Sequence, residues 1–148
     1  MNPDFCDMLC AFNDAGVEYL VVGAYALATH GLVRATGDID LWVRPTASNA
    51  ERVISALRKF GAPLGDLTEE DLCAPDIVFQ IGLPPRRIDL LTSIASVEFD
   101  EAWKTRRQTT VSEIPFSVLG RAMLLKNKRS TGRTKDAADA EWLENNPE

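Results

Sequence analysis

The sequence is poor in the residues that build disulfide frameworks and zinc sites. It has three cysteines and one histidine among 148 residues. An odd number of cysteines does not form a disulfide framework. Cys6 and Cys10 lie four residues apart, and a zinc site there would need two further ligands from a chain with a single histidine. We therefore expect these two cysteines to be small buried hydrophobic residues in a reducing cytosol.

The sequence also lacks long hydrophobic runs and an excess of positive charge. No apolar segment approaches the length of a membrane span, and the N-terminus lacks the basic segment and apolar run of a signal peptide. We therefore expect a cytoplasmic protein with no membrane partner. The formal net charge is −6, which argues against strong sequence-independent binding of nucleic acid by the chain as a whole, although a local basic patch could still bind it.

The length and the order of the predicted elements indicate a single domain over residues 1–148. No internal repeat or linker divides the chain, and a chain of this length can bury roughly two thirds of its unfolded surface. The predicted fold class is α/β (α+β), a mixed β-sheet flanked by helices, with a helical C-terminal part at about residues 117–148. We expect helices at residues 3–16, 24–30, 47–60, 97–106, 119–128 and 135–143. We expect strands or short extended segments at residues 18–22, 36–43, 77–82, 87–91, 109–111 and 116–118.

The predicted strand at residues 36–43 carries two aspartates, Asp38 and Asp40. Strand residues alternate between faces, so both carboxylates share one face with Trp42, while the intervening apolar residues face a core. Aspartate is unfavourable in strands, and two adjacent carboxylates repel each other unless they are solvated or bind a cation. The pattern therefore favours one or two divalent cations, with Mg²⁺ expected because it takes hard oxygen ligands and substrate phosphates. The alternative is two surface aspartates on a half-exposed strand.

A third carboxylate, Asp89, lies in the predicted strand at residues 87–91. If this strand pairs beside the first, Asp89 joins Asp38 and Asp40 as a metal ligand or as a general base. The alternative is a salt bridge between Asp89 and a neighbouring arginine.

Two further segments could bind phosphate. Gly23 and Ala24 stand at the start of a predicted helix, where glycine permits close approach and free N–H groups favour anions. The segment at residues 121–135 carries six basic residues and no acidic one. It could clamp a triphosphate or contact a polynucleotide, or it could simply be a solvated helix face.

These motifs together resemble those of the DNA-polymerase-β-like nucleotidyltransferase superfamily. Gly23-Ala24, thirteen further residues and then Asp38-Ile39-Asp40-Leu41 are similar to its signature, and Arg87-Ile88-Asp89-Leu90 is similar to its third-carboxylate strand. The spacing of Arg34, Thr36, Asp38 and Asp40, together with the later Lys-x-x-Arg…Lys-Asp-x-x-Asp segment, is most similar to a small bacterial branch. That branch includes abortive-infection (AbiEii-like) toxins.

The resemblance implies a minimal nucleotidyltransferase fold and transfer of a nucleoside monophosphate from an NTP to an acceptor hydroxyl on a protein, an RNA or a small molecule. It implies that Asp38, Asp40 and Asp89 are catalytic and hold two Mg²⁺ ions, with Mn²⁺ as a substitute. Gly23 and Ala24 would cradle the phosphates, and Lys126 and Lys135 would neutralise their charge. The toxin branch implies a toxin component with an antitoxin partner.

Ala24 is the one position that departs from the superfamily pattern, which has Gly or Ser there. Its backbone N–H can still meet a phosphate, but a serine hydroxyl is absent. This departure favours an alternative function, a nucleotidyltransferase-fold protein that binds or regulates with little or no catalysis. A glycosyltransferase metal motif would also place two aspartates two residues apart, but such enzymes generally need a longer domain and give no place to Asp89.

Overall fold

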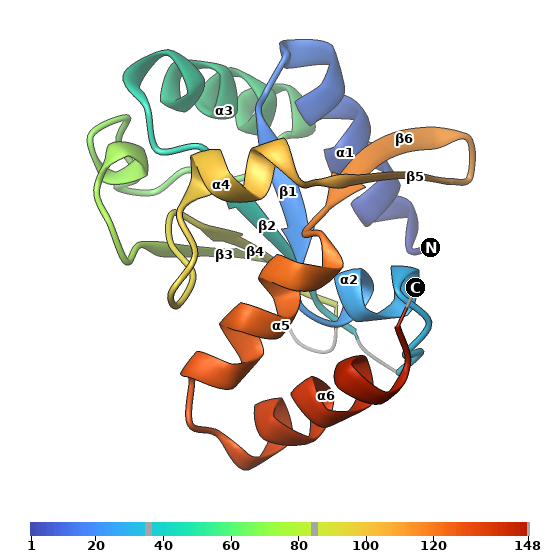
Figure 1. The fold of residues 1–148 in the computed structure, drawn as a ribbon. Coiled ribbons are helices and arrows are strands. Elements are labelled where there is room, and N and C mark those ends of the chain that lie inside the picture. The colour runs from blue at the N-terminus through green and yellow to red at the C-terminus, as the bar shows by residue number, and fades with distance from the viewer. Residues whose placement is uncertain (35–36, 84–85, 148) are drawn as a thin grey trace.

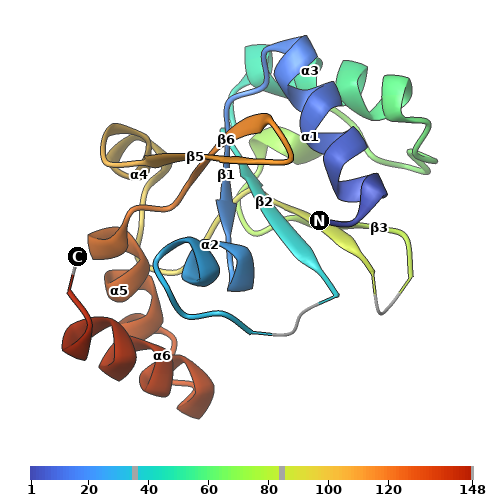
Figure 2. The same ribbon diagram turned by 90° about the vertical axis from the view of Figure 1, so that its right-hand side faces the viewer.

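A six-stranded mixed sheet lies at the centre of the protein, with helices on both of its faces (Figures 1 and 2). The structure is a computed structural model that describes residues 1–34, 37–83 and 86–147. The strand order is β3-β4-β2-β1-β6-β5. The strands are β1 (Tyr19–Val22), β2 (Ile39–Val43), β3 (Val78–Ile81), β4 (Ile88–Leu91), β5 (Arg107–Val111) and β6 (Ile114–Val118). The pairs β1–β6 and β2–β4 are parallel and the other three are antiparallel, which confirms the predicted mixed sheet.

The helices form a layer on each face and a separate pair at one end of the sheet. They are α1 (Pro3–Ala15), α2 (Ala24–Thr29), α3 (Ala47–Phe60), α4 (Phe99–Lys104), α5 (Arg121–Ser130) and α6 (Thr134–Asn145), with a 3-10 turn η1 (Asp71–Cys73). Helices α1 and α3 pack together on one face, and α4 lies on the other (Figure 2). In both views the α5–α6 pair lies at the end of the sheet where α2 is found.

The two long helices on the first face begin and end where the sequence predicts. In α1 the side chain of Asn2 accepts a hydrogen bond from the Asp4 N–H at 2.7 Å, and Gly16 ends the helix in the left-handed conformation. In α3 the hydroxyl of Thr46 accepts a hydrogen bond from the backbone N–H of Asn49, and Gly61 ends the helix with φ 92°. These ends are set by local hydrogen bonds, so the sequence alone locates them.

Other predicted bounds differ from the structure. Strand β2 begins at Ile39, so Asp38 precedes it, and the expected start at Thr36 falls outside the described residues. The extended segments at residues 109–111 and 116–118 are longer than expected and pair as a hairpin. Its turn places Ser112 and Glu113 at φ 52° and 66°. These two residues lack the Asn-Gly pattern that usually marks such a turn in a sequence.

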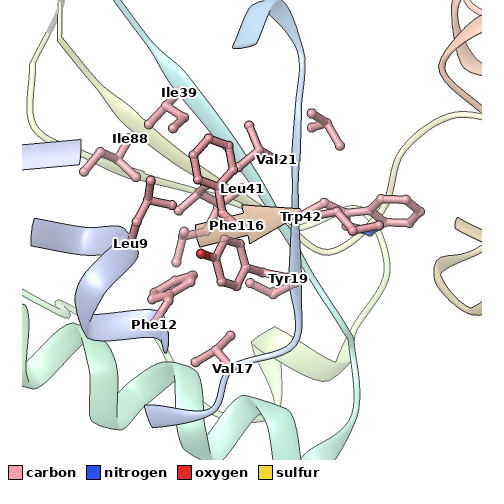
Figure 3. Packing of buried hydrophobic residues seen from close by; sticks show 14 of the residues in the cluster. Leu9, Phe12, Val17, Tyr19, Val21, Ile39, Leu41, Trp42, Ile88 and Phe116 are labelled. Carbon is pink, nitrogen blue, oxygen red and sulfur yellow. The ribbon is translucent and has the colours of Figure 1, made fainter. Parts of the chain in front are cut away.

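The two faces of β2 meet different partners, as the alternation rule predicts (Figure 3). Ile39 and Leu41 point toward the side where Leu9 and Phe12 of α1 lie, and Trp42 points to the opposite side. There Trp42 packs edge-on against Phe99 of α4, with ring centroids 5.0 Å apart. Because the strand is covered on both faces, only its start, near Asp38 and Asp40, is left to line a cavity.

The prediction that both cysteines of α1 are buried is wrong. Cys6 is half-buried and Cys10 is exposed. The helix turns its core face, which includes Phe5, Leu9 and Phe12, toward the sheet, and Cys10 lies outside that stripe. Among the residues that the structure describes, no helix is long and apolar enough to cross a membrane.

Candidate active site

Asp40 and Asp89 are direct neighbours across two paired strands. In the parallel ladder between β2 and β4, Asp40 is the register partner of Asp89. Adjacent strands lie about 4.8 Å apart, and paired residues point to the same face. Asp89 is only 8% exposed, and Asp40 is half-buried. Two carboxylates far apart in the sequence are therefore brought together by the pairing that the sequence analysis required of these strands.

Gly23 makes room for one of these carboxylates. It follows Val22, which is the register partner of Asp40 on the other side of β2. A Cβ atom at residue 23 would lie 2.3 Å from the Asp40 Oδ2 atom, and the backbone has φ 70° and ψ −149°, a conformation that suits only glycine. The glycine of the motif is thus required by a side chain of the protein itself.

The side chain of Arg87 bridges the carboxylates of Asp38 and Asp89. Its guanidinium donates to both oxygens of Asp89, from Nε at 2.7 Å and from Nη2 at 3.1 Å. The same Nη2 atom lies 3.4 Å from an oxygen of Asp38, and the Arg87 backbone N–H donates to the other oxygen of Asp38 at 3.0 Å. The predicted alternative for Asp89, a salt bridge with a neighbouring arginine, is therefore present in the structure.

The carboxylates perturb one another. The pKa of Asp40 is raised to about 6, first by burial and then by the negative charges of Asp89 and Asp38. The positive charges of Arg87 and Lys128 lower the same pKa without cancelling the rise. Proximity of this kind is typical of sites that hold a cation or transfer a proton.

A buried ion-pair network on the α5–α6 pair faces the carboxylates. The ammonium of Lys128 lies 3.0 Å from Asp136 and 3.2 Å from Asp139, and its side chain is only 12% exposed. Both aspartates are buried, and Asp139 also pairs with Arg34. Burial opposes ionisation of Asp136, but hydrogen bonds from Thr131 and Lys128 outweigh it and hold its pKa at about 2.

These groups meet in one cavity of about 480 Å³. It is lined by Gly23, Ala24, Asp38, Asp40, Arg87, Asp89, Lys128, Arg133, Lys135 and Asp136. Six of the seven residues named from the sequence therefore line a common space. The seventh, Lys126, lies elsewhere and pairs with Glu101 of α4 at 3.2 Å.

Lys128 lines the cavity, whereas Lys126, the lysine named from the sequence, lies outside it. Residues two apart on a helix point in nearly opposite directions, about 200° apart. Asp136 and Asp139 are three apart, so they share a face of α6 and point to one partner. That spacing indicates a shared basic partner for the two aspartates, but it does not choose between Lys126 and Lys128.

The donor set suits a hard divalent cation in part. Asp40 and Asp89 supply adjacent carboxylate oxygens, the ligands that Mg²⁺ and Mn²⁺ prefer. Within the described ranges, however, no three His, Cys, Asp or Glu side chains are arranged so that they could hold a metal ion together. Arg87 bridges Asp38 and Asp89, so a three-carboxylate site requires this guanidinium to move.

Comparisons with known proteins identify the fold. No protein-family model and no curated protein matches the sequence. The lincosamide antibiotic adenylyltransferase LnuA, solved with lincomycin, is similar over 99% of this chain and 98% of its own, with TM-score 0.61 and 15% identity. A candidate nucleotidyltransferase from Thermotoga maritima has TM-score 0.62 and 14% identity over 95% of this chain and 91% of its own.

A third similar structure is ANT(2")-Ia in complex with adenylyl-2"-tobramycin. It has TM-score 0.58 and 13% identity over 94% of this chain and 84% of its own. At these identities the likeness shows the fold. The chain therefore has the nucleotidyltransferase fold, a mixed sheet flanked by helices, as the sequence motifs implied.

Proposed function

We propose that residues 1–148 form a single nucleotidyltransferase domain. It would transfer a nucleoside monophosphate from an NTP to an acceptor hydroxyl and release pyrophosphate. The observation that carries this proposal is the register pairing of Asp40 with Asp89 at the edge of a cavity that also contains basic side chains. The two antibiotic-modifying structures with the same fold support nucleotidyl transfer as the reaction class.

We propose Asp38, Asp40 and Asp89 as the ligands of two divalent cations, Mg²⁺ in the cell with Mn²⁺ as a substitute. When bound, the cations would neutralise and orient the phosphates of the nucleotide. Asp89, which is nearly buried, would also accept the proton of the acceptor hydroxyl. The carboxylates need no rearrangement of the sheet for this role, because the β2–β4 ladder fixes Asp40 beside Asp89.

The basic residues of the cavity would bind the triphosphate. Lys128 replaces Lys126 in this role because it lies in the cavity, held by Asp136 and Asp139. Lys135 remains in the proposed phosphate site, where it also lines the cavity. The backbone at Gly23 and Ala24 would meet the phosphates from the opposite wall. Preorganised positive charge of this kind accounts for much of the catalysis in phosphoryl transfer.

We further propose, from the sequence resemblance, a cytoplasmic bacterial protein of the abortive-infection branch with an antitoxin partner. Arg34 and Asp139, two residues of the pattern on which the resemblance rests, form an ion pair. Thr36 of the same pattern lies outside the described residues. The acceptor would be a protein, an RNA or a small molecule.

A second candidate is a nucleotidyltransferase-fold protein that binds or regulates with little or no catalysis. Two observations favour it: Ala24 stands where the pattern has Gly or Ser, and Arg87 pairs with Asp89. Calorimetry with ATP and Mg²⁺, combined with an assay for transfer, separates the two candidates. Absence of ATP binding at millimolar nucleotide, together with absence of transfer, supports the second candidate.

The decisive experiment is incubation with each α-labelled NTP, a divalent cation and a cell lysate. We expect one NTP to label an acceptor and Asp40→Asn and Asp89→Asn to lower labelling at least about a hundredfold. The matched control is Asp7→Asn, which makes the same change at an exposed position of α1. Full labelling by both site variants would refute the assignment.

A further inference from the structure

Arg87 uses its whole guanidinium face on the carboxylates of the candidate metal site. It makes a two-point contact with Asp89 and a third contact with Asp38, and its backbone N–H also binds Asp38. The Arg87 side chain is about a quarter exposed and lines the cavity, whereas Asp89 is almost buried. The arginine therefore approaches the carboxylates from the side that is open to the cavity.

The oxygen atoms that Arg87 engages are those that a divalent cation would need. A carboxylate accepts a bidentate guanidinium through both of its oxygens. With Arg87 in place, both Asp89 oxygens accept a hydrogen bond from its guanidinium. Asp38 accepts one from the Arg87 backbone N–H and forms an ion pair with Nη2. A cation between Asp38 and Asp89 competes with the guanidinium, because both carry positive charge and both bind the same carboxylate oxygen atoms.

We propose that Arg87 is a displaceable counterion. In the metal-free protein it pairs with Asp38 and Asp89 and offsets part of their negative charge, and it must release Asp89 when a divalent cation binds. This inference rests on the proposed metal site. In this role Arg87 competes with the divalent cation for Asp89. The opposite role would be that of a fixed arginine, which orients Asp89 and so strengthens metal binding. Because Arg87 faces the cavity, its release requires only side-chain rotation and no change in the sheet.

The two roles predict opposite effects on metal affinity. Removing a competing cation tightens binding of the metal alone, whereas removing an orienting partner weakens it. Arg86 supplies a matched control, because it is the adjacent residue, carries the same charge and is exposed. Comparing Arg87→Gln with Arg86→Gln therefore cancels the effect of net charge.

The test is a titration of the metal-free protein with Mn²⁺ alone, with free Mn²⁺ measured by electron paramagnetic resonance. We expect Arg87→Gln to bind Mn²⁺ about tenfold more tightly than wild type, since one charge-assisted contact is lost. We expect Arg86→Gln to stay within about twofold of wild type. Arg87→Lys keeps the charge but cannot make the two-point contact with Asp89. Its affinity for Mn²⁺ should therefore lie between those of wild type and Arg87→Gln.

Thermal unfolding gives a second readout on the same proteins. Without metal, Arg87→Gln should melt below wild type, because Asp38 and Asp89 lose their counterion. Saturating Mn²⁺ should raise its midpoint more than that of wild type. If Arg87→Gln does not fold without metal, Arg87→Lys is compared with wild type in its place.

The results separate this inference from the proposed function. If wild type binds Mn²⁺ and Asp40→Asn does not, while Arg87→Gln binds no more tightly than Arg86→Gln, the metal site stands and the counterion role is overturned. If neither wild type nor Arg87→Gln binds Mn²⁺, both are overturned. If only Arg87→Gln binds, the counterion role is supported in its strongest form, as a block on the site.

Discussion

The α-carbon of Gly23 faces the carboxylate of Asp40 so closely that a Cβ at residue 23 would stand 2.3 Å from Oδ2. This contact joins the end of β1 to the start of β2, the two strands that carry the motif. A glycine at this point of a phosphate-binding turn is usually explained by the ligand. Here the protein's own carboxylate already requires it, and the cavity lies beside both residues.

We therefore expect Gly23→Ala to lower the free energy of unfolding by roughly 2–4 kcal/mol, since it combines a steric clash with a strained φ. It should also weaken Mn²⁺ binding, because Asp40 must shift. Urea denaturation and Mn²⁺ titration measure the two effects.

Gly65→Ala is the matched control for that variant. Gly65 also has positive φ, at 56°, but a Cβ there meets nothing within 4 Å. It should cost only about 1 kcal/mol, from the backbone conformation alone, and leave Mn²⁺ binding unchanged. Equal losses of stability in the two variants would show that the contact with Asp40 carries no energy.

The sequence predicts the parts of the site that follow from local patterns. Strand alternation predicts which face of its strand each carboxylate takes, and the sequence placed Asp89 beside Asp40 only on the condition that the two strands pair. The structure supplies that pairing, between β2 and β4. The ends of α1 and α3 follow from single capping residues. Local patterns could not show whether Lys126 or Lys128 lies in the cavity, because that depends on how α5 is rotated against α4 and α6.

Long-range charge pairing was the second feature that the sequence did not reveal. Asp136 and Asp139 were compatible with an ordinary acidic first turn of a helix. In the structure they are buried and bind Lys128, and Asp139 also binds Arg34 from a distant segment. No local periodicity encodes a contact between residues this far apart in the chain.

Asp40→Asn should stabilise the metal-free protein at neutral pH. The pKa of Asp40 is raised to about 6 in the folded state, so the folded protein holds this proton more tightly than the unfolded chain does. The wild type therefore loses stability as pH rises from about 4 to about 6, by roughly 1–3 kcal/mol. Asparagine removes that loss. The groups facing Asp40 are Asp38, Asp89, Arg87 and Lys128.

Denaturation of wild type and Asp40→Asn between pH 4 and pH 8 measures this effect. The stability difference should be largest above pH 6 and should shrink toward pH 4. A difference that is constant across this range would show that ionisation of Asp40 does not strain the fold. Asp7→Asn, at an exposed position, should show no such dependence.

Lys128→Met should cost far more stability than Lys126→Met. Removal of Lys128 leaves Asp136 and Asp139 buried without their shared cation, which typically costs about 3–5 kcal/mol. Lys126 and Glu101 are about half exposed, so their pair should contribute within about 1 kcal/mol. ATP affinity should fall only for Lys128→Met. If Lys126→Met is the variant that loses ATP binding, the phosphate site has been assigned to the wrong face of α5.

The contribution of Asp136 to the free energy of unfolding should depend on pH in the opposite sense to that of Asp40. The pKa of Asp136 is lowered to about 2 in the folded state, because hydrogen bonds from Thr131, Lys128 and Arg133 outweigh the effect of burial. A lowered pKa stabilises the fold at pH values above about 4, and this contribution is lost as pH falls toward 2. Asp136→Asn should therefore cost roughly 2 kcal/mol at pH 7 and progressively less below pH 4.

Urea denaturation at pH 7, 4 and 3 measures the difference. A cost that does not decrease at pH 3 would mean that Asp136 acts through its shape and hydrogen bonds, and that its negative charge does not hold Lys128 in the cavity.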